Sequence, residues 1–210
     1  MSDSDQYELN EGDEFIFAID KSGSMQASDA QLEGKQVSRI VRAKVKGTEY
    51  IRAGAKYDKT GPTLLAFGSD VVVYENVSED KAEAILGKIQ AHDSATRTDL
   101  AIQKAWELHQ ASGSKQTVLF LLTDGEPTGI PNAQEVVKET IRGIASKVKA
   151  SGNEHSFAIS FVTVGVPNEG LKAFLTDLDD NLGAEIDIVD VKAIEEIGSL
   201  EQAFAGALHD

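Results

Sequence analysis

Short apolar runs alternate along this chain with longer segments in which apolar residues recur at helical spacing. Runs of roughly four to eight apolar residues are typical of strands that are buried on both faces of a sheet. The pattern predicts strands at 15–19, 63–67, 71–74, 117–122, 157–164 and 185–189. Because only the turn Gly68-Ser69-Asp70 separates the second strand from the third, we expect these two to pair as an antiparallel hairpin.

The segments between the strands predict helices at 31–55, 78–89, 100–111, 133–150, 169–178 and 191–208. Ser78 is expected to cap the second of them. Strands that alternate with helices indicate a mostly parallel sheet covered on both faces. The predicted fold class is therefore α/β: a doubly wound, Rossmann-like, three-layer α/β/α sandwich with one antiparallel edge strand.

Length and composition favour one domain. The chain has 210 residues, and a hydrophobic content of 41% can fill a core of that size. We expect a polar N-terminal segment over 1–14 and a single domain over 15–208. The absence of cysteine excludes disulfides, thiolate metal sites and cysteine nucleophiles.

The charge balance is strongly acidic and bears on the partners. Lys and Arg number 20 against 35 Asp and Glu, which gives a formal net charge of −15. Nucleic acids and anionic membranes would be repelled, whereas cations and basic partners are favoured. Solubility alone is an equally good explanation of this acidity. Because the N-terminus resembles no signal peptide and no apolar run reaches the length of a membrane span, we expect a cytoplasmic protein.

Oxygen-bearing side chains follow the predicted strands at three places. Asp20, Ser22 and Ser24 come directly after the first strand, and one carboxylate with two hydroxyls suits a hard divalent cation. Asp124 follows the strand at 117–122, and Thr96 precedes the helix that leads into that strand. Since ligands gather at the carboxyl ends of strands where the strand order reverses, these three loops can meet there.

These residues resemble the metal-ion-dependent adhesion site (MIDAS) of the von Willebrand factor A (vWA) family. The family's first loop, Asp-x-Ser-x-Ser, is matched by Asp20, Ser22 and Ser24. Its second loop supplies a threonine just before a helix, which Thr96 matches best, with Thr98 as the alternative. Its third is an aspartate in Thr-Asp-Gly, matched by Asp124. Three motifs in the family's order make the resemblance specific, and it extends from about residue 15 to 208.

The resemblance implies a function as a binding module. Mg²⁺ is the expected ion, with Mn²⁺ or Ca²⁺ as alternatives, and an Asp or Glu of a partner protein would displace a water from it. Ser22, Ser24 and Thr96 would be direct ligands, while direct and water-mediated roles stay open for Asp20 and Asp124. Stand-alone intracellular relatives resemble accessory subunits of AAA-type ATPases, chelatases or stress-resistance systems, so we expect a bacterial or phage accessory protein.

Other interpretations remain for the same residues. Asp20 and Ser22 could cap a helix and Asp124-Gly125 could form a plain turn, but all three motifs together are poorly explained in this way. Glu126 is expected to be solvated in a loop rather than to lie at the rim of the site. Trp106 is expected in the core, and an acidic cluster around Asp179 is expected to be a solvated helix end. The histidines lack metal-ligand spacing: His92, His109, His155 and His209.

Two further functional classes compete with the binding module. A metal-dependent hydrolase is disfavoured, because the chain has no phosphate-binding loop, dinucleotide fingerprint or nucleophile elbow, so we expect no enzyme. A structural or assembly subunit could use the same fold without a metal. Self-assembly that persists in a chelator would distinguish this last class.

Overall fold

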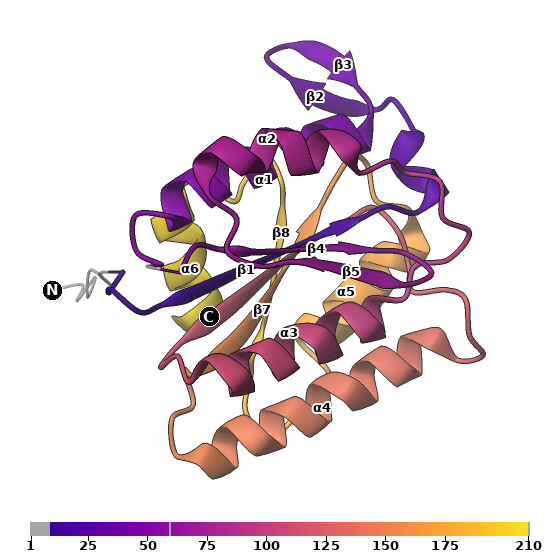
Figure 1. Ribbon diagram of the computed structural model, residues 1–210. Helices are drawn as coiled ribbons and strands as arrows, with labels where there is room; N and C mark the ends of the chain where they lie inside the picture. The colour runs from indigo at the N-terminus through magenta and orange to yellow at the C-terminus, as the bar shows by residue number, and fades with distance from the viewer. Residues whose placement is uncertain (1–8, 59, 210) are drawn as a thin grey trace, which may run out of the picture.

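The computed structural model describes residues 9–58 and 60–209, and a six-stranded sheet runs through its middle (Figure 1). The strand order is β5-β4-β1-β6-β7-β8. Only β5 is antiparallel to its neighbour, and it lies at an edge. The strands are β1 (Glu14–Asp20), β4 (Thr63–Phe67), β5 (Val71–Tyr74), β6 (Thr117–Thr123), β7 (Phe157–Thr163) and β8 (Val189–Ala193).

Helices cover both faces of this sheet, as Figure 1 shows. One face carries α1 (Arg39–Gly54), α2 (Glu79–Lys88) and α6 (Leu200–His209). The other carries α3 (Thr98–Ser112), α4 (Ala133–Ser151) and α5 (Glu169–Asp179). The predicted three-layer, doubly wound α/β/α class with one antiparallel edge strand is therefore confirmed.

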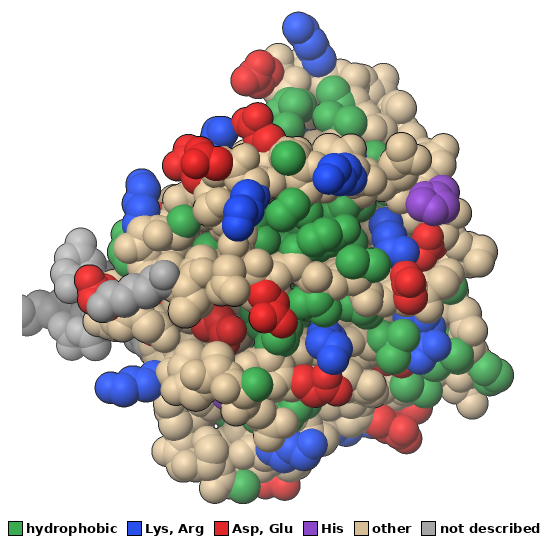
Figure 2. All heavy atoms as spheres, viewed as in Figure 1, with side chains coloured by type: hydrophobic (Ala, Val, Ile, Leu, Met, Phe, Trp, Pro, Cys, Tyr) green, Lys and Arg blue, Asp and Glu red, His purple; other side chains and the backbone are tan. Residues whose placement is uncertain are grey.

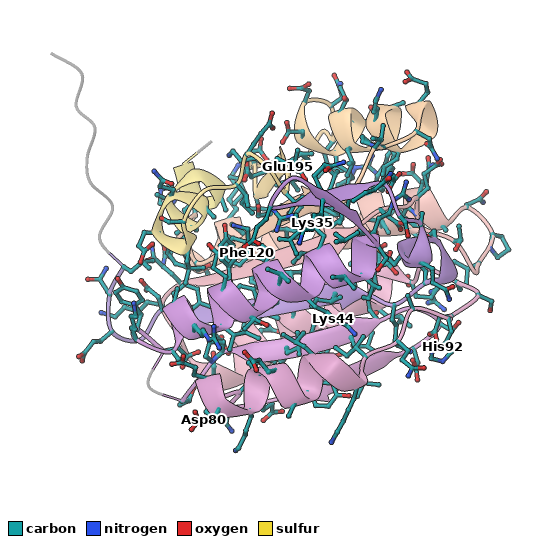
Figure 3. The ribbon with its side chains drawn as sticks, turned by 90° about the horizontal axis from the view of Figure 1, so that it is seen from above. Lys35, Lys44, Asp80, His92, Phe120 and Glu195 are labelled. Carbon is teal, nitrogen blue, oxygen red and sulfur yellow. The ribbon has the colours of Figure 1, made fainter. Side chains whose placement is uncertain are left out.

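The central strand β1 contributes alternate side chains to two separate hydrophobic clusters. Phe17 stacks on Phe120 with ring centroids 5.4 Å apart, and Tyr50 of α1 packs edge-on against the same ring at 5.4 Å. Figure 3 shows Phe120 in the sheet close to α1. Ile16 and Ala18 point into the opposite cluster. Burial on both faces explains why the strand is apolar without alternation.

The topology places a crevice at one end of β1. The chain leaves β1 through α1 to β4 on one side, and later returns to β6 on the other side of β1. The strand order thus reverses between β1 and β6. In open α/β sheets, ligands bind at the carboxyl ends of the strands that flank such a reversal.

The first predicted helix is wrong over its N-terminal part. Residues 31–38 do not join the helix; β2 (Ala30–Leu32) and β3 (Lys35–Val37) form a small antiparallel hairpin that projects beyond α1 (Figure 1). Glu33 and Gly34 join these strands with φ values of 50° and 75°. Two successive residues with positive φ make a tight hairpin turn, so the helix begins only at Arg39.

The C-terminal predictions are also shifted. The predicted strand 185–189 is wrong except for its last residue, and β8 continues to Ala193, where a helix was expected from 191. The last helix begins at Leu200. Ser199 and Gln202 form a reciprocal capping box there: Gln202 N–H donates to Ser199 Oγ at 3.3 Å, and Ser199 N–H donates to Gln202 Oε1 at 3.1 Å.

The remaining helices and strands begin and end within a few residues of their predicted bounds. Ser78 occupies the N-cap position of α2, but its side chain makes no capping hydrogen bond. Of the polar segment 1–14, residues 1–8 lie outside the described part of the chain. Among the described residues, no helix has the length and apolarity that a membrane crossing requires.

Candidate functional site

Two carboxylates follow neighbouring strands of the sheet. Asp20 is the last residue of β1, and Asp124 comes directly after β6. The two strands pair in parallel with Ile19 opposite Leu122, so their carboxyl ends meet at the same edge. The sheet register therefore brings the first and third sequence motifs together.

Asp20 is fully buried, and both of its oxygens are held. Oδ1 accepts the backbone N–H of Ser22 at 2.7 Å, and Oδ2 accepts the hydroxyl of Thr123 at 2.7 Å. Burial raises the pKa of Asp20 to about 6, although both hydrogen bonds oppose that shift. The carboxylate is thus fixed in orientation, and a cation nearby would favour its charged form.

Hydroxyls connect the first loop to Asp124. Ser22 Oγ lies 3.0 Å from Ser24 Oγ, and the Ser24 hydroxyl donates to Asp124 Oδ1 at 2.8 Å. The serines flank the start of a short 3-10 helix, η1 (Gly23–Gln26), which turns the chain sharply after β1. Oxygen atoms from two loops are therefore within hydrogen-bond distance of one another.

The second loop brings Thr96 to the same place. Thr96 is buried, and its N–H donates to Thr128 Oγ1 at 2.9 Å while its carbonyl accepts the N–H of Thr128 at 3.0 Å. These bonds tie the second loop to the third. Thr98 is the first residue of α3, and its buried hydroxyl has no hydrogen-bond partner within the described chain.

The three loops surround a pocket of about 490 Å³. Its lining comes from 22–24, 93–96 and 125–128, together with Asn168. Thr96 belongs to this lining and Thr98 does not. The side chains of Asp20 and Asp124 are buried behind it, so a small ion in the pocket would meet hydroxyl oxygens before it met the carboxylates.

A larger hollow of about 810 Å³ lies between α1 and α2. On the face that Figure 2 shows, hydrophobic side chains gather between α2 and the edge strand β5. None of the three loops contributes to the larger hollow. It lacks the converging oxygen ligands of the smaller pocket. The chemistry therefore singles out the pocket at the strand ends.

An arginine that the sequence analysis did not predict lies beside the carboxylates. Arg39 Nη1 lies 2.7 Å from Asp124 Oδ2, and its other nitrogens bind both oxygens of Asp29 at 2.6 and 2.5 Å. This pairing raises the pKa of Arg39 and lowers that of Asp29. Arg39 was expected inside a helix over 31–55. Its contact with Asp124 follows from its place as the first residue of α1.

A second ion-pair cluster fixes the neighbouring loop. Lys21 Nζ lies 2.7 Å from Asp93 and 2.7 Å from Asp70. Although burial acts in the opposite direction, the bonds from Lys21 and from the N–H of Ser69 lower the pKa of Asp93. His92 lies at this end of the molecule (Figure 3), and its backbone N–H donates to the carbonyl of Lys21 at 2.9 Å. The residue after Asp20 thus anchors the loop that carries Thr96.

Several secondary expectations can be compared with the structure. Glu126 lines the pocket and accepts a hydrogen bond from Gln134 at 2.6 Å, so the preference for a merely solvated loop position is wrong. Trp106 is in the core, as expected. Asp177 pairs with Lys138. The side chain of His209 lies outside the described residues.

The described residues contain no group of three or more His, Asp or Glu side chains that could hold a metal on their own. Any cation at this site would therefore depend on the hydroxyls of Ser22, Ser24 and Thr96. Hard divalent cations accept such oxygen ligands and complete their shell with water. The residues present fit a weakly liganded, water-retaining divalent ion.

The chain matches the family model of the von Willebrand factor type A domain over residues 14–202. Since this match covers most of the 210 residues, the chain belongs to that family. A search of the curated proteins gives no match.

Solved structures share the fold at low sequence identity. The PilB minor pilin from Streptococcus sanguinis is 14% identical with a TM-score of 0.63, over 95% of this chain and 60% of that one. A von Willebrand factor type A protein from Catenulispora acidiphila is 17% identical with a TM-score of 0.61, over 93% and 41%. The manganese-loaded TRAP protein of Plasmodium vivax is 15% identical with a TM-score of 0.56, over 94% and 75%. This chain thus spans less than two thirds of the first two.

Proposed function

We propose that this protein is a divalent-metal-dependent protein-binding module, in which a cation at the pocket engages an acidic side chain of a partner. One observation carries the proposal: Ser22, Ser24 and Thr96 line one pocket, while Asp20 accepts the backbone N–H of Ser22 and Asp124 accepts the hydroxyl of Ser24. A bound Mg²⁺ would supply a positively charged centre with exchangeable water positions.

The division of roles follows from which side chains line the pocket. Ser22, Ser24 and Thr96 line the pocket and would hold the ion directly, whereas the carboxylates of Asp20 and Asp124 lie outside the lining and would balance its charge through the hydroxyls or through water. Neutral direct ligands leave most of the ion's charge uncompensated. A carboxylate from a partner is then the ligand that gains most by displacing a water.

The net charge of −15 bears on the rest of the partner's surface. An acidic protein repels an acidic surface at long range, so the contacting Asp or Glu should lie in a neutral or basic surround. A component of an AAA-type ATPase complex is the partner class that we propose. The manganese in the TRAP structure agrees with a metal-binding role for this fold.

The cation is tested first. Calorimetric titration of Mg²⁺ or Mn²⁺ should give one site in the wild type and none in Asp20→Ala or Thr96→Ala, because these remove a charge or a ligand at the pocket. Asp80→Ala removes an exposed carboxylate on α2 and should leave the isotherm unchanged. Indistinguishable isotherms for all four proteins would refute the assignment.

The partner is tested by a pull-down from the native host, with and without chelator. Retained proteins should be lost in the chelator, and also with Thr96→Ala or Asp124→Ala, while Asp80→Ala keeps them. Substitution of the contacting Asp or Glu in the captured partner should abolish binding. Equal retention in both lanes would contradict metal-bridged recognition.

An assembly subunit that does not use the metal is the second candidate. It is favoured by names among the solved structures of this fold, which include a minor pilin, a mussel byssus matrix protein and a pili tip protein. Sedimentation of the purified chain in a chelator decides this: a defined oligomer that persists without metal favours assembly. A metal-dependent hydrolase has no comparable support, and we propose a non-enzymatic role.

A further inference from the structure

Arg39 is a cation at the N-terminus of a helix, a position that disfavours positive charge. It is the first residue of α1, and the N-terminus of a helix carries partial positive charge. Its side chain is only 14% exposed, and it bridges Asp29 and Asp124. Such a position requires strong compensation, which these two carboxylates provide.

The geometry holds the guanidinium in one orientation. Its Nε and Nη2 atoms bind the two oxygens of Asp29 in a bidentate pair, which leaves Nη1 directed at Asp124 Oδ2. The hairpin β2–β3 lies between Asp29 and Arg39 in the sequence, so this pair also closes the base of the hairpin. Rotation of the arginine would break all three hydrogen bonds.

The two carboxylate oxygens of Asp124 therefore have different partners. Oδ1 accepts the hydroxyl of Ser24, which faces the pocket, while Oδ2 is taken by Arg39. The side chain of Asp124 is fully buried, so the arginine acts on it with little screening by water. A positive charge fixed behind the ligand set opposes the entry of a second cation in front of it.

We propose that Arg39 is a built-in competitor of the divalent ion: it holds Asp124 Oδ2, weakens cation binding and leaves the bound ion more attractive to a partner's carboxylate. The inference rests on the proposed function. Asp29 is a positioning residue for Arg39 in this arrangement. The predicted consequence is a site that is loaded only at high cation concentration and is completed by the partner.

Mn²⁺ titration of Arg39 variants at one ionic strength tests the proposal. Arg39→Gln should bind Mn²⁺ at least about tenfold more tightly than the wild type, because the positive charge that is paired with Asp124 is removed. Asp29→Asn, which keeps the arginine and removes its counter-charge, should bind roughly threefold more weakly or worse. A residue that merely braced the site would weaken binding when it is replaced, so the sign of the change distinguishes the two roles.

Arg52→Gln is the matched control. Arg52 lies on the same helix, and pairs with Glu79 and Glu83 of α2 instead of with the site. The Arg52→Gln substitution removes the same charge from the protein and should leave the Mn²⁺ affinity within about twofold of that of the wild type. Saturating Mn²⁺ should also raise the melting temperature more in Arg39→Gln than in the wild type, since tighter binding stabilises more.

The outcomes separate this inference from the proposed function. Unchanged or weaker Mn²⁺ binding in a folded Arg39→Gln variant overturns the competitor role, while wild-type binding that Thr96→Ala abolishes still supports the proposed function. If Arg39→Gln does not fold, Asp29→Asn decides, and unchanged or tighter binding there overturns the inference. Absence of Mn²⁺ binding in the wild type and in Arg39→Gln overturns both.

Discussion

At the scale of single residues, the site is a problem of buried charge. Asp20 and Asp124 are both removed from water, and a buried carboxylate needs compensation. Asp20 receives two hydrogen bonds that lower its pKa, but burial outweighs them and raises it to about 6. Asp124 receives the hydroxyl of Ser24 and the charge of Arg39. Both aspartates follow apolar strands in the sequence, but they are stabilised by different contacts.

A buried histidine at the opposite end of α3 gives a pH-dependent prediction. His109 packs against Trp106 and Phe157, and its Nδ1 lies 2.8 Å from Thr117 Oγ1. Burial lowers the pKa of His109 below its usual value of 6.5, although Glu14 opposes the shift. The folded state therefore favours the neutral ring. Stability from this residue should be complete above pH 6.5 and fall as the pH decreases below it.

An NMR titration should place the His109 pKa below 6.5, and the loss of unfolding free energy on acidification should be smaller in His109→Gln. A His109 resonance that titrates at or above 6.5 would contradict this account.

At the scale of elements, turns, capping residues and strand pairing decide where helices begin. Residues 30–37 form a hairpin because Glu33 and Gly34 adopt positive φ, and this turn overrides the helical spacing of the apolar residues around it. At the other end, apolar residues over 188–197 fit either a strand or a helix, and pairing of β8 with β7 selects the strand. The capping box of Ser199 and Gln202 then starts the helix.

Two serines at helix starts make a matched pair of variants. Ser199→Ala removes a capping hydrogen bond and should cost about 1 kcal/mol of unfolding free energy. Ser78→Ala changes an N-cap residue whose side chain makes no capping bond, and should cost less. Chemical denaturation of both variants measures the difference. Equal losses would show that the Ser199 bond contributes nothing to the start of α6.

At the scale of the whole molecule, the sheet is stabilised independently of the site. Two hydrophobic clusters cover its faces, while the pocket lies at one edge. Burial of apolar surface of this extent is the main source of folding free energy. The core should therefore stay buried whether or not a cation occupies the pocket.

The expected result of metal removal follows from this separation. Chelator-treated protein should keep its circular dichroism spectrum, and Mg²⁺ at about ten times its Kd should add about 1.4 kcal/mol of stability and raise the melting temperature. Thr96→Ala should lose that increase and keep the fold. A random-coil spectrum in the chelator would show that the ion is required for folding.

By itself, the sequence determined the alternation of strands and helices and the three oxygen-bearing motifs, because the periodicity of apolar residues and the order of motifs are local properties. It also placed Asp20 and Asp124 correctly at the ends of two strands. The tertiary structure alone decided that Thr96 lines the pocket and Thr98 does not, and that Arg39 pairs with Asp124. Those contacts join residues up to 85 positions apart, and they depend on strand order and helix start rather than on any local pattern.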